Sequence, residues 1–156
     1  MPDAVFVLLA FGVMEPVAYL AHRFVMHGVG MGWHRSHHQP RLAPFEKNDL
    51  YPITMAGLTV MAMAAATTFP SVEVLLPVGG GVAAYGFAYL FLHDVYIHRR
   101  LPFFTAVIGP LERLREAHRI HHLWSAEPYG FLFPIVPAEL KARAATVERD
   151  PLAAPA

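Results

Sequence analysis

The chain contains no cysteine, and only 15% of its 156 residues are charged. Without cysteine there are no disulfides and no thiolate-bound metals, so any metal must be held by nitrogen and oxygen atoms. The charged fraction lies well below the roughly 25% usual for soluble domains. Hydrophobic residues, by contrast, make up 55% of the sequence. This composition predicts a membrane protein.

Net charge indicates no class of partner, because Lys and Arg together number 12, as do Asp and Glu. There is no basic stripe with interleaved aromatic residues, so we expect no nucleic-acid partner. The length suits one domain over residues 1–156. Residues 144–156 are rich in alanine and proline, and we expect this tail to be mobile.

Three runs of residues are long and apolar enough to cross a membrane as helices. They are residues 4–21, 51–69 and 74–92. The first run contains one charged residue, Glu15, and the other two contain none. Shorter apolar runs at 101–111 and 129–138 are interrupted by proline, and we expect them to be interfacial or re-entrant.

The basic residues predict how the chain is oriented. All twelve Lys and Arg residues lie within 23–47 or 99–149. Basic flanks remain on the cytoplasmic side, so the N-terminus and the turn at 70–73 should face outward. We therefore predict an all-α membrane protein, a small bundle of about three transmembrane helices with a cytoplasmic, histidine-rich helical cap.

The histidines form two copies of one pattern, a pair five residues apart followed by an HxxHH triplet. The first copy is His22, His27, His34, His37 and His38, and the second is His93, His98, His118, His121 and His122. These are all ten histidines of the chain. A lone histidine is usually an ordinary polar residue, but this repetition on one membrane face indicates a metal site.

Helical geometry restricts how these rings converge. At about 100° per residue, an HxxHH triplet places its three imidazoles on one helical face. A spacing of five gives an offset of about 140°, so either each pair serves two metals or its helix is distorted. Ten imidazoles are too many for one ion and suit two ions with four or five nitrogen ligands each. Imidazole suits iron, zinc, copper or nickel.

Five polar residues are candidates to orient the ligands. Glu15, Tyr19 and His22 lie along nearly one helical face, so Glu15 or Tyr19 is a candidate to accept a proton from a ligand imidazole and fix its tautomer. The alternative is that Glu15 hydrogen-bonds another helix. Asn48 and Asp94 are similar candidates, as is Asp49, although surface solvation or helix capping suits each of them.

Several segments resemble the membrane fatty acid hydroxylase superfamily, which is marked by four histidine boxes on the cytoplasmic side, and within it the bacterial β-carotene 3-hydroxylases. The matching segments are AHRFVMHGVGMGWHRSHHQPR, FEKNDLY, AYGFAYLFLHDVYIHRRLPF and AHRIHH, with GFL after Tyr129. Together they cover roughly residues 15–133.

The resemblance implies a non-haem di-iron monooxygenase of the bacterial inner membrane, with metal ligands at all ten histidines. Zinc would be able to replace iron in a preparation. Such enzymes use O2 and reduced ferredoxin to hydroxylate carbon 3 of each β-ionone ring of β-carotene, giving zeaxanthin through cryptoxanthin. Hydroxylation of an unactivated C–H bond needs an oxidant that no side chain supplies, which agrees with a metal site beside the bilayer.

Two further sets of residues gain candidate roles from this resemblance. Aromatic candidates to line a carotenoid groove are Trp33, Phe87, Tyr89, Phe91, Phe103 and Phe104. Packing against lipid or core is the default for most of them. Basic candidates to dock an acidic ferredoxin are Arg99, Arg100, Arg113, Arg115 and Arg119. Any cytoplasmic membrane flank contains such residues.

Other functions compete with this interpretation. The same metal chemistry would serve a sterol or fatty acyl hydroxylase, a ketolase or a desaturase. A metal transporter is a rival of another class, but it needs polar ligands along a route through the bilayer. The predicted spans hold no histidine at mid-depth, and only Glu15 is charged. A hydrolytic zinc enzyme is the third alternative, because histidine-bound zinc activates water.

Overall fold

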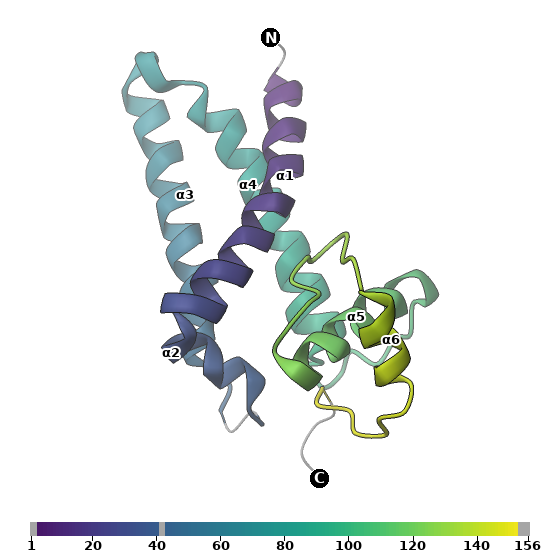
Figure 1. Cartoon of the computed structure of the whole chain (residues 1–156). Coiled ribbons are helices and arrows are strands. Elements are labelled where there is room, and N and C mark those ends of the chain that lie inside the picture. The colour runs from purple at the N-terminus through teal and green to yellow at the C-terminus, as the bar shows by residue number, and fades with distance from the viewer. Residues whose placement is uncertain (1–2, 41–42, 153–156) are drawn as a thin grey trace.

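The computed structural model describes residues 3–40 and 43–152, and within them the chain forms helices and loops without any strand. Three long helical stretches form a bundle (Figure 1). The beginning of the first stretch and the turn between the second and third stretches lie at one end of this bundle, and the shorter helices lie at the other. The predicted all-α class is confirmed.

The three predicted spans are present as helices long and apolar enough to cross a membrane. They are Asp3–Val29, Lys47–Thr68 and Leu75–Ile97. The first consists of α1 (Asp3–Leu20) followed by a π-helix, η1 (Ala21–Val29). No residue of α1 is buried in the protein, which suits a helix surrounded by lipid.

The second and third stretches are built in a similar way. A 3-10 turn, η3 (Lys47–Asp49), leads into α3 (Leu50–Thr68). After the short turn η4 (Pro70–Val72), α4 (Leu75–Tyr89) continues into a second π-helix, η5 (Leu90–Ile97).

Helix α4 packs against both α1 and α3. Gly81 makes this close packing possible, because a Cβ atom at that position would collide with the backbone oxygen of Val7 on α1. Gly79 allows the same close approach to Met63 on α3. Small residues at helix crossings are the usual means of close packing between membrane helices.

The remaining helices cover the end of the bundle that holds the histidines. They are α2 (Met31–His34), η2 (Arg35–His38), α5 (Gly109–Trp124) and α6 (Ala138–Ala144). Helix α5 is held to η5 by a small buried cluster of Tyr96, Ile97, Leu114 and Leu152.

The C-terminal residues as far as 152 contact the rest of the chain, and the mobility expected of this tail stays a prediction. Leu152 and Ala144 are buried, and Arg115 forms an ion pair with Asp150 at 2.9 Å. These contacts attach residues 144–152 to α5. Residues 153–156 lie outside the described residues.

The two proline-interrupted apolar runs contain little regular structure. Most of 101–111 is a loop leading into α5, and 129–137 is irregular up to the start of α6. Phe103, Phe133 and Ile135 have 78%, 74% and 85% of their surface exposed. Within the described residues neither run forms a fourth helix long enough to span, as the sequence predicts.

Candidate metal centre

The two π-helices account for the histidine pairs spaced five apart. A π-helix joins residues five apart by backbone hydrogen bonds, so their side chains lie on the same face. In η5 and its C-terminal cap, the N–H of His98 donates to the carbonyl oxygen of His93 at 2.9 Å. His22 and His27 both lie in η1. Of the two sequence alternatives, the distorted helix is the one observed.

The imidazole nitrogens gather into two groups. The ligand atoms of His22, His27, His34 and His121 all lie within 4.8 Å of one another, and so do those of His37, His93, His98 and His118. His38 Nε2 lies 3.1 Å from His34 Nε2, and His122 Nε2 lies 3.1 Å from His37 Nε2. We call His22, His27, His34, His38 and His121 the first cluster. We call His37, His93, His98, His118 and His122 the second cluster.

Each HxxHH triplet contributes to both clusters. The outer members, four residues apart, join the cluster of their own histidine pair: His34 and His38 the first, His118 and His122 the second. The middle member of each triplet joins the other cluster: His37 belongs to the second cluster and His121 to the first. A triplet covers about 100° of helix surface, which is wide enough to border two ions side by side. The two copies of the pattern therefore hold each other together.

The distances between the nitrogens suit metal coordination. Nε2 atoms lie 3.2 Å apart between His22 and His34, 3.1 Å apart between His27 and His121, and 2.9 Å apart between His98 and His118. Metal–imidazole bonds of about 2.1 Å would separate neighbouring nitrogens by about 3.0 Å in an octahedral site and about 3.4 Å in a tetrahedral one. The observed spacing falls within or close to this range.

Three rings in the first cluster have a hydrogen-bond acceptor at the outer nitrogen, Nδ1, and these acceptors fix the tautomers of the rings. His34 Nδ1 lies 2.7 Å from Asn48 Oδ1, His22 Nδ1 lies 3.1 Å from the carbonyl of Tyr129, and His121 Nδ1 lies 2.6 Å from that of Ala126. A carbonyl oxygen only accepts, so each Nδ1 donates its proton and each Nε2 lone pair faces inward. Converging lone pairs repel one another unless a cation lies between them. The donor set therefore fits a metal.

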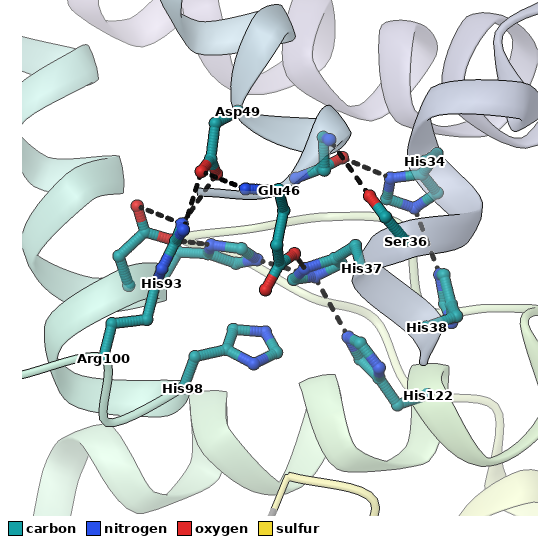
Figure 2. Close-up of polar contacts among 12 residues, drawn as sticks. His34, Ser36, His37, His38, Glu46, Asp49, His93, His98, Arg100 and His122 are labelled. Atoms are coloured by element: carbon teal, nitrogen blue, oxygen red, sulfur yellow. Dashed lines mark hydrogen bonds and ion pairs between the residues drawn. The ribbon is translucent and has the colours of Figure 1, made fainter. Parts of the chain in front are cut away.

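The second cluster is oriented by charged groups. His93 Nδ1 donates to Asp94 Oδ1 at 2.8 Å, and Arg100 lies 3.4 Å from Asp94 Oδ2. Arg100 also donates to both carboxyl oxygens of Asp49 at 2.7 Å. Figure 2 shows His37 between His93 and His122, which come from η5 and α5.

Burial keeps the imidazoles uncharged and available to a metal. Burial, with a smaller contribution from neighbouring histidines, lowers the pKa of His34 to about 4 and that of His38 to about 3. The same causes place other imidazole pKa values well below 6.5, those of His37, His98, His118, His121 and His122.

Of the residues that the sequence predicts to orient the ligands, Asn48 and Asp94 contact an imidazole. Asn48 is 2% exposed and lies against His34, and Asp94 lies against His93, so neither is merely solvated. Asp49 accepts from the backbone N–H of Glu46 at 2.9 Å in a capping box. Helix capping, one of its expected roles, is therefore observed together with the pairing to Arg100.

Within the described residues, neither Glu15 nor Tyr19 hydrogen-bonds directly to an imidazole. Glu15 Oε1 accepts from the backbone N–H groups of residues 131–133, and Tyr85 on α4 donates to Oε2 at 2.7 Å. Tyr19 donates to Glu127 at 2.9 Å. Both residues hold the loop after α5, and Glu15 also bonds another helix, which was the alternative expectation.

Of the six aromatic candidates, Tyr89 has a ring contact with a described histidine. It stacks on His93 with ring centroids 4.6 Å apart, and Phe131 packs against both rings, 4.9 Å from Tyr89 and 6.2 Å from His93. Phe87 and Phe103 face outward. The other three, Trp33, Phe91 and Phe104, pack against aromatic rings elsewhere.

Four of the five candidate docking arginines are bonded within the chain. Arg99 and Arg100 donate to backbone oxygens of neighbouring loops, and Arg115 and Arg119 hold the C-terminal residues. Arg113 is exposed.

Sequence reasoning missed the backbone groups that orient the first cluster. The carbonyls of Ala126 and Tyr129 and the hydroxyl of Ser125, 3.3 Å from His38 Nδ1, belong to the loop after α5. Backbone carbonyls leave no residue-type signal, and the nearby GFL match was the one indication of this segment.

The chain matches the fatty acid hydroxylase family over residues 7–138. It is 40% identical to the beta-carotene hydroxylase of Pantoea ananas over 136 residues, a match that covers 84% of this chain and 77% of that protein. It is 38% identical to the beta-carotene hydroxylase of Pseudescherichia vulneris over 145 residues, covering 90% and 81%.

A chloroplastic relative is also similar. The beta-carotene 3-hydroxylase of Haematococcus lacustris is 39% identical over 147 residues, which cover 87% of this chain and 45% of that longer protein. No solved structure matches the chain significantly.

Proposed function

This chain belongs to the fatty acid hydroxylase family, and on that premise we propose that it hydroxylates β-carotene as a non-haem di-iron monooxygenase. The reaction places a hydroxyl group on carbon 3 of each β-ionone ring, giving zeaxanthin through cryptoxanthin. O2 is the cosubstrate, and reduced ferredoxin supplies the electrons. The relatives named beta-carotene hydroxylase support the substrate.

The observation on which the proposal rests is the convergence of ten Nε2 atoms into two clusters of five. The five histidines of each cluster would hold one iron ion. Iron bound there supplies the capacity to reduce O2 and to oxidise an unactivated C–H bond. Zinc in the same sites lacks redox chemistry.

The protein's own contribution is to hold, orient and insulate these ions. Carbonyl and carboxyl acceptors at Nδ1 fix the ligand rings, and second-shell contacts of this kind are expected to strengthen metal binding. His34 and His121 are almost fully buried, so bulk water has little access to this part of the site. Such exclusion protects a reactive centre from side reactions.

We place the clusters at the cytoplasmic surface of a bacterial inner membrane. This orientation rests on the basic residues, which flank the histidine-bearing ends of the spans. β-Carotene dissolved in the bilayer would then approach from the lipid side, past Tyr89 and Phe131 beside the second cluster. Because every imidazole lies at one end of the bundle, the arrangement offers no ligand route across the membrane of the kind a transporter needs.

Ferredoxin would dock from the aqueous side. Arg113 is the exposed member of the five candidate arginines, and an acidic protein is attracted to such a surface in a salt-dependent manner.

Expression in bacterial cells that accumulate β-carotene tests the proposal. Chromatography with mass spectrometry should detect cryptoxanthin and zeaxanthin with the protein and not with a His27→Ala, His118→Ala double variant. Oxidation of another lipid, with β-carotene left unchanged, would contradict the substrate assignment.

A further inference from the structure

Residues 125–133, which we call the 125–133 segment, touch three imidazoles of the first cluster. The carbonyl of Tyr129 accepts from His22 Nδ1, and the carbonyl of Ala126 accepts from His121 Nδ1. Ser125 Oγ lies 3.3 Å from His38 Nδ1. The segment has no helical structure after residue 125, so these positions depend on what fixes its backbone.

The first membrane-spanning stretch holds this segment at two levels. Near the histidines, Glu127 Oε1 accepts from Tyr19 at 2.9 Å and from Arg23 at 2.9 Å. The second oxygen of Glu127 accepts from the backbone N–H of Tyr129 at 3.1 Å. Further along α1, Glu15 forms the second attachment.

Glu15 satisfies three consecutive backbone N–H groups. Its Oε1 lies 2.8 Å from the nitrogen of Phe131, 3.0 Å from that of Leu132 and 3.1 Å from that of Phe133. Glu15 lies near the middle of the stretch Asp3–Val29. Irregular backbone at such a depth is tolerated only where its polar groups find partners, and an acidic residue there is otherwise costly.

We propose that Glu15 is a positioning residue of the first cluster. It acts through the 125–133 segment: by fixing the backbone at Phe131 it holds the carbonyl of Tyr129, two residues earlier, against His22 Nδ1. The same attachment keeps the Phe131 ring on Tyr89 beside His93. The inference rests on the proposed function in so far as the clusters bind metal, and it goes beyond it in assigning Glu15 a role.

A simpler role for Glu15 would be to join α1 to α4 through Tyr85. The two roles separate by variant. Tyr85→Phe removes the bond between helices but leaves the bonds to the 125–133 segment. Glu15→Met removes both sets of bonds at similar side-chain length, and Glu15→Gln keeps one oxygen acceptor. Glu73→Gln, at an exposed glutamate in the turn between α3 and α4, is the matched control.

Cobalt(II) binding by purified protein in detergent provides the first readout. Each Glu15 variant is measured in a His118→Ala background, where the first cluster remains, and in a His27→Ala background, where the second remains. We expect Glu15→Met to weaken cobalt binding to the first cluster about tenfold or more, with an altered visible absorption band. Binding to the second cluster, and binding in Tyr85→Phe and Glu73→Gln, should stay unchanged.

Maleimide labelling provides a second readout that needs no metal. The chain has no cysteine, so Leu132→Cys reports detachment of the segment and Ala144→Cys, at a buried site of α6, reports general unfolding. Glu15→Met should speed labelling at position 132 and leave position 144 protected.

Three results would overturn the proposal. They are unchanged cobalt binding and labelling in Glu15→Met, equal weakening of both clusters in Glu15→Gln, or a loss in Tyr85→Phe as large as that in Glu15→Met. Should Glu15→Met unfold, Glu15→Gln decides, and it must weaken the first cluster alone. A wild type that binds two cobalt ions but leaves β-carotene unchanged would contradict the proposed function and not this inference.

Discussion

Replacing Asn48 by leucine tests how the first cluster is oriented. Asn48 is 2% exposed, and its Oδ1 accepts from His34 Nδ1 at 2.7 Å. Leucine has a similar volume but no acceptor. His34 then either leaves a buried N–H without a partner or moves its proton to Nε2, where it would face the metal.

The expected loss follows from the cost of that unpaired group. A buried donor without a partner costs about 1–3 kcal/mol, and each 1.4 kcal/mol is about tenfold in affinity. Asn48→Leu should therefore weaken iron binding to the first cluster by about 5- to 150-fold. Asn48→Asp retains an acceptor and should bind nearly as the wild type.

A competition titration of ferrous iron against a coloured chelator, under argon, measures both sites in one experiment. The Asn48→Leu protein should show one site like the wild type and one weakened site. Two unchanged sites would refute the reasoning, because His34 would then need no acceptor at Nδ1. Equal weakening of both sites would also refute it, since the two clusters would not be separate.

Three further predictions concern metal content, charge and pH. His27→Ala and His118→Ala should each reduce bound iron from two ions to one by elemental analysis, and each should abolish hydroxylation; retention of both ions would contradict the ligand sets. Arg100→Leu leaves two carboxyl groups without their cation and should lower the free energy of unfolding by about 2 kcal/mol or more in denaturant titrations, whereas an unchanged midpoint would show that the pair contributes nothing. Because burial holds the pKa of His34 at about 4 and that of His38 at about 3, the unfolded chain binds protons below about pH 6.5 that the folded chain does not. The melting temperature of metal-free protein should therefore fall between pH 7 and pH 5, and a rise would contradict the buried, neutral rings.

The sequence predicted the three spans, for physical reasons, and it predicted that the histidines lie together at one end of them. Hydrophobic length is a property of composition, so the spans could be read directly, although π-helices carry the helical stretches past residues 21 and 92. The histidine spacing posed a conflict that α-helical geometry could not resolve. His93 and His98 would lie about 140° apart on an α-helix. A π-helix brings them together, and the spacing of five residues was its only sign in the sequence.

What the sequence did not reveal depends on contacts between distant segments. The alignment of Glu15, Tyr19 and His22 along one face of a helix was real, but their partners lie more than a hundred residues away in the 125–133 segment. Spacing within a helix specifies which residues share a face and not what that face meets. The exchange of His37 and His121 between clusters was likewise invisible, because it requires the relative placement of η2 and α5.

Turnover of β-carotene by iron-reconstituted protein under 18O2 tests the central claim most directly. With reduced ferredoxin present, mass spectrometry should find one 18O atom in each new hydroxyl group at carbon 3, and none when the label is supplied as water. Hydroxyl oxygen derived from water, or no product from protein that holds two iron ions, would contradict the account.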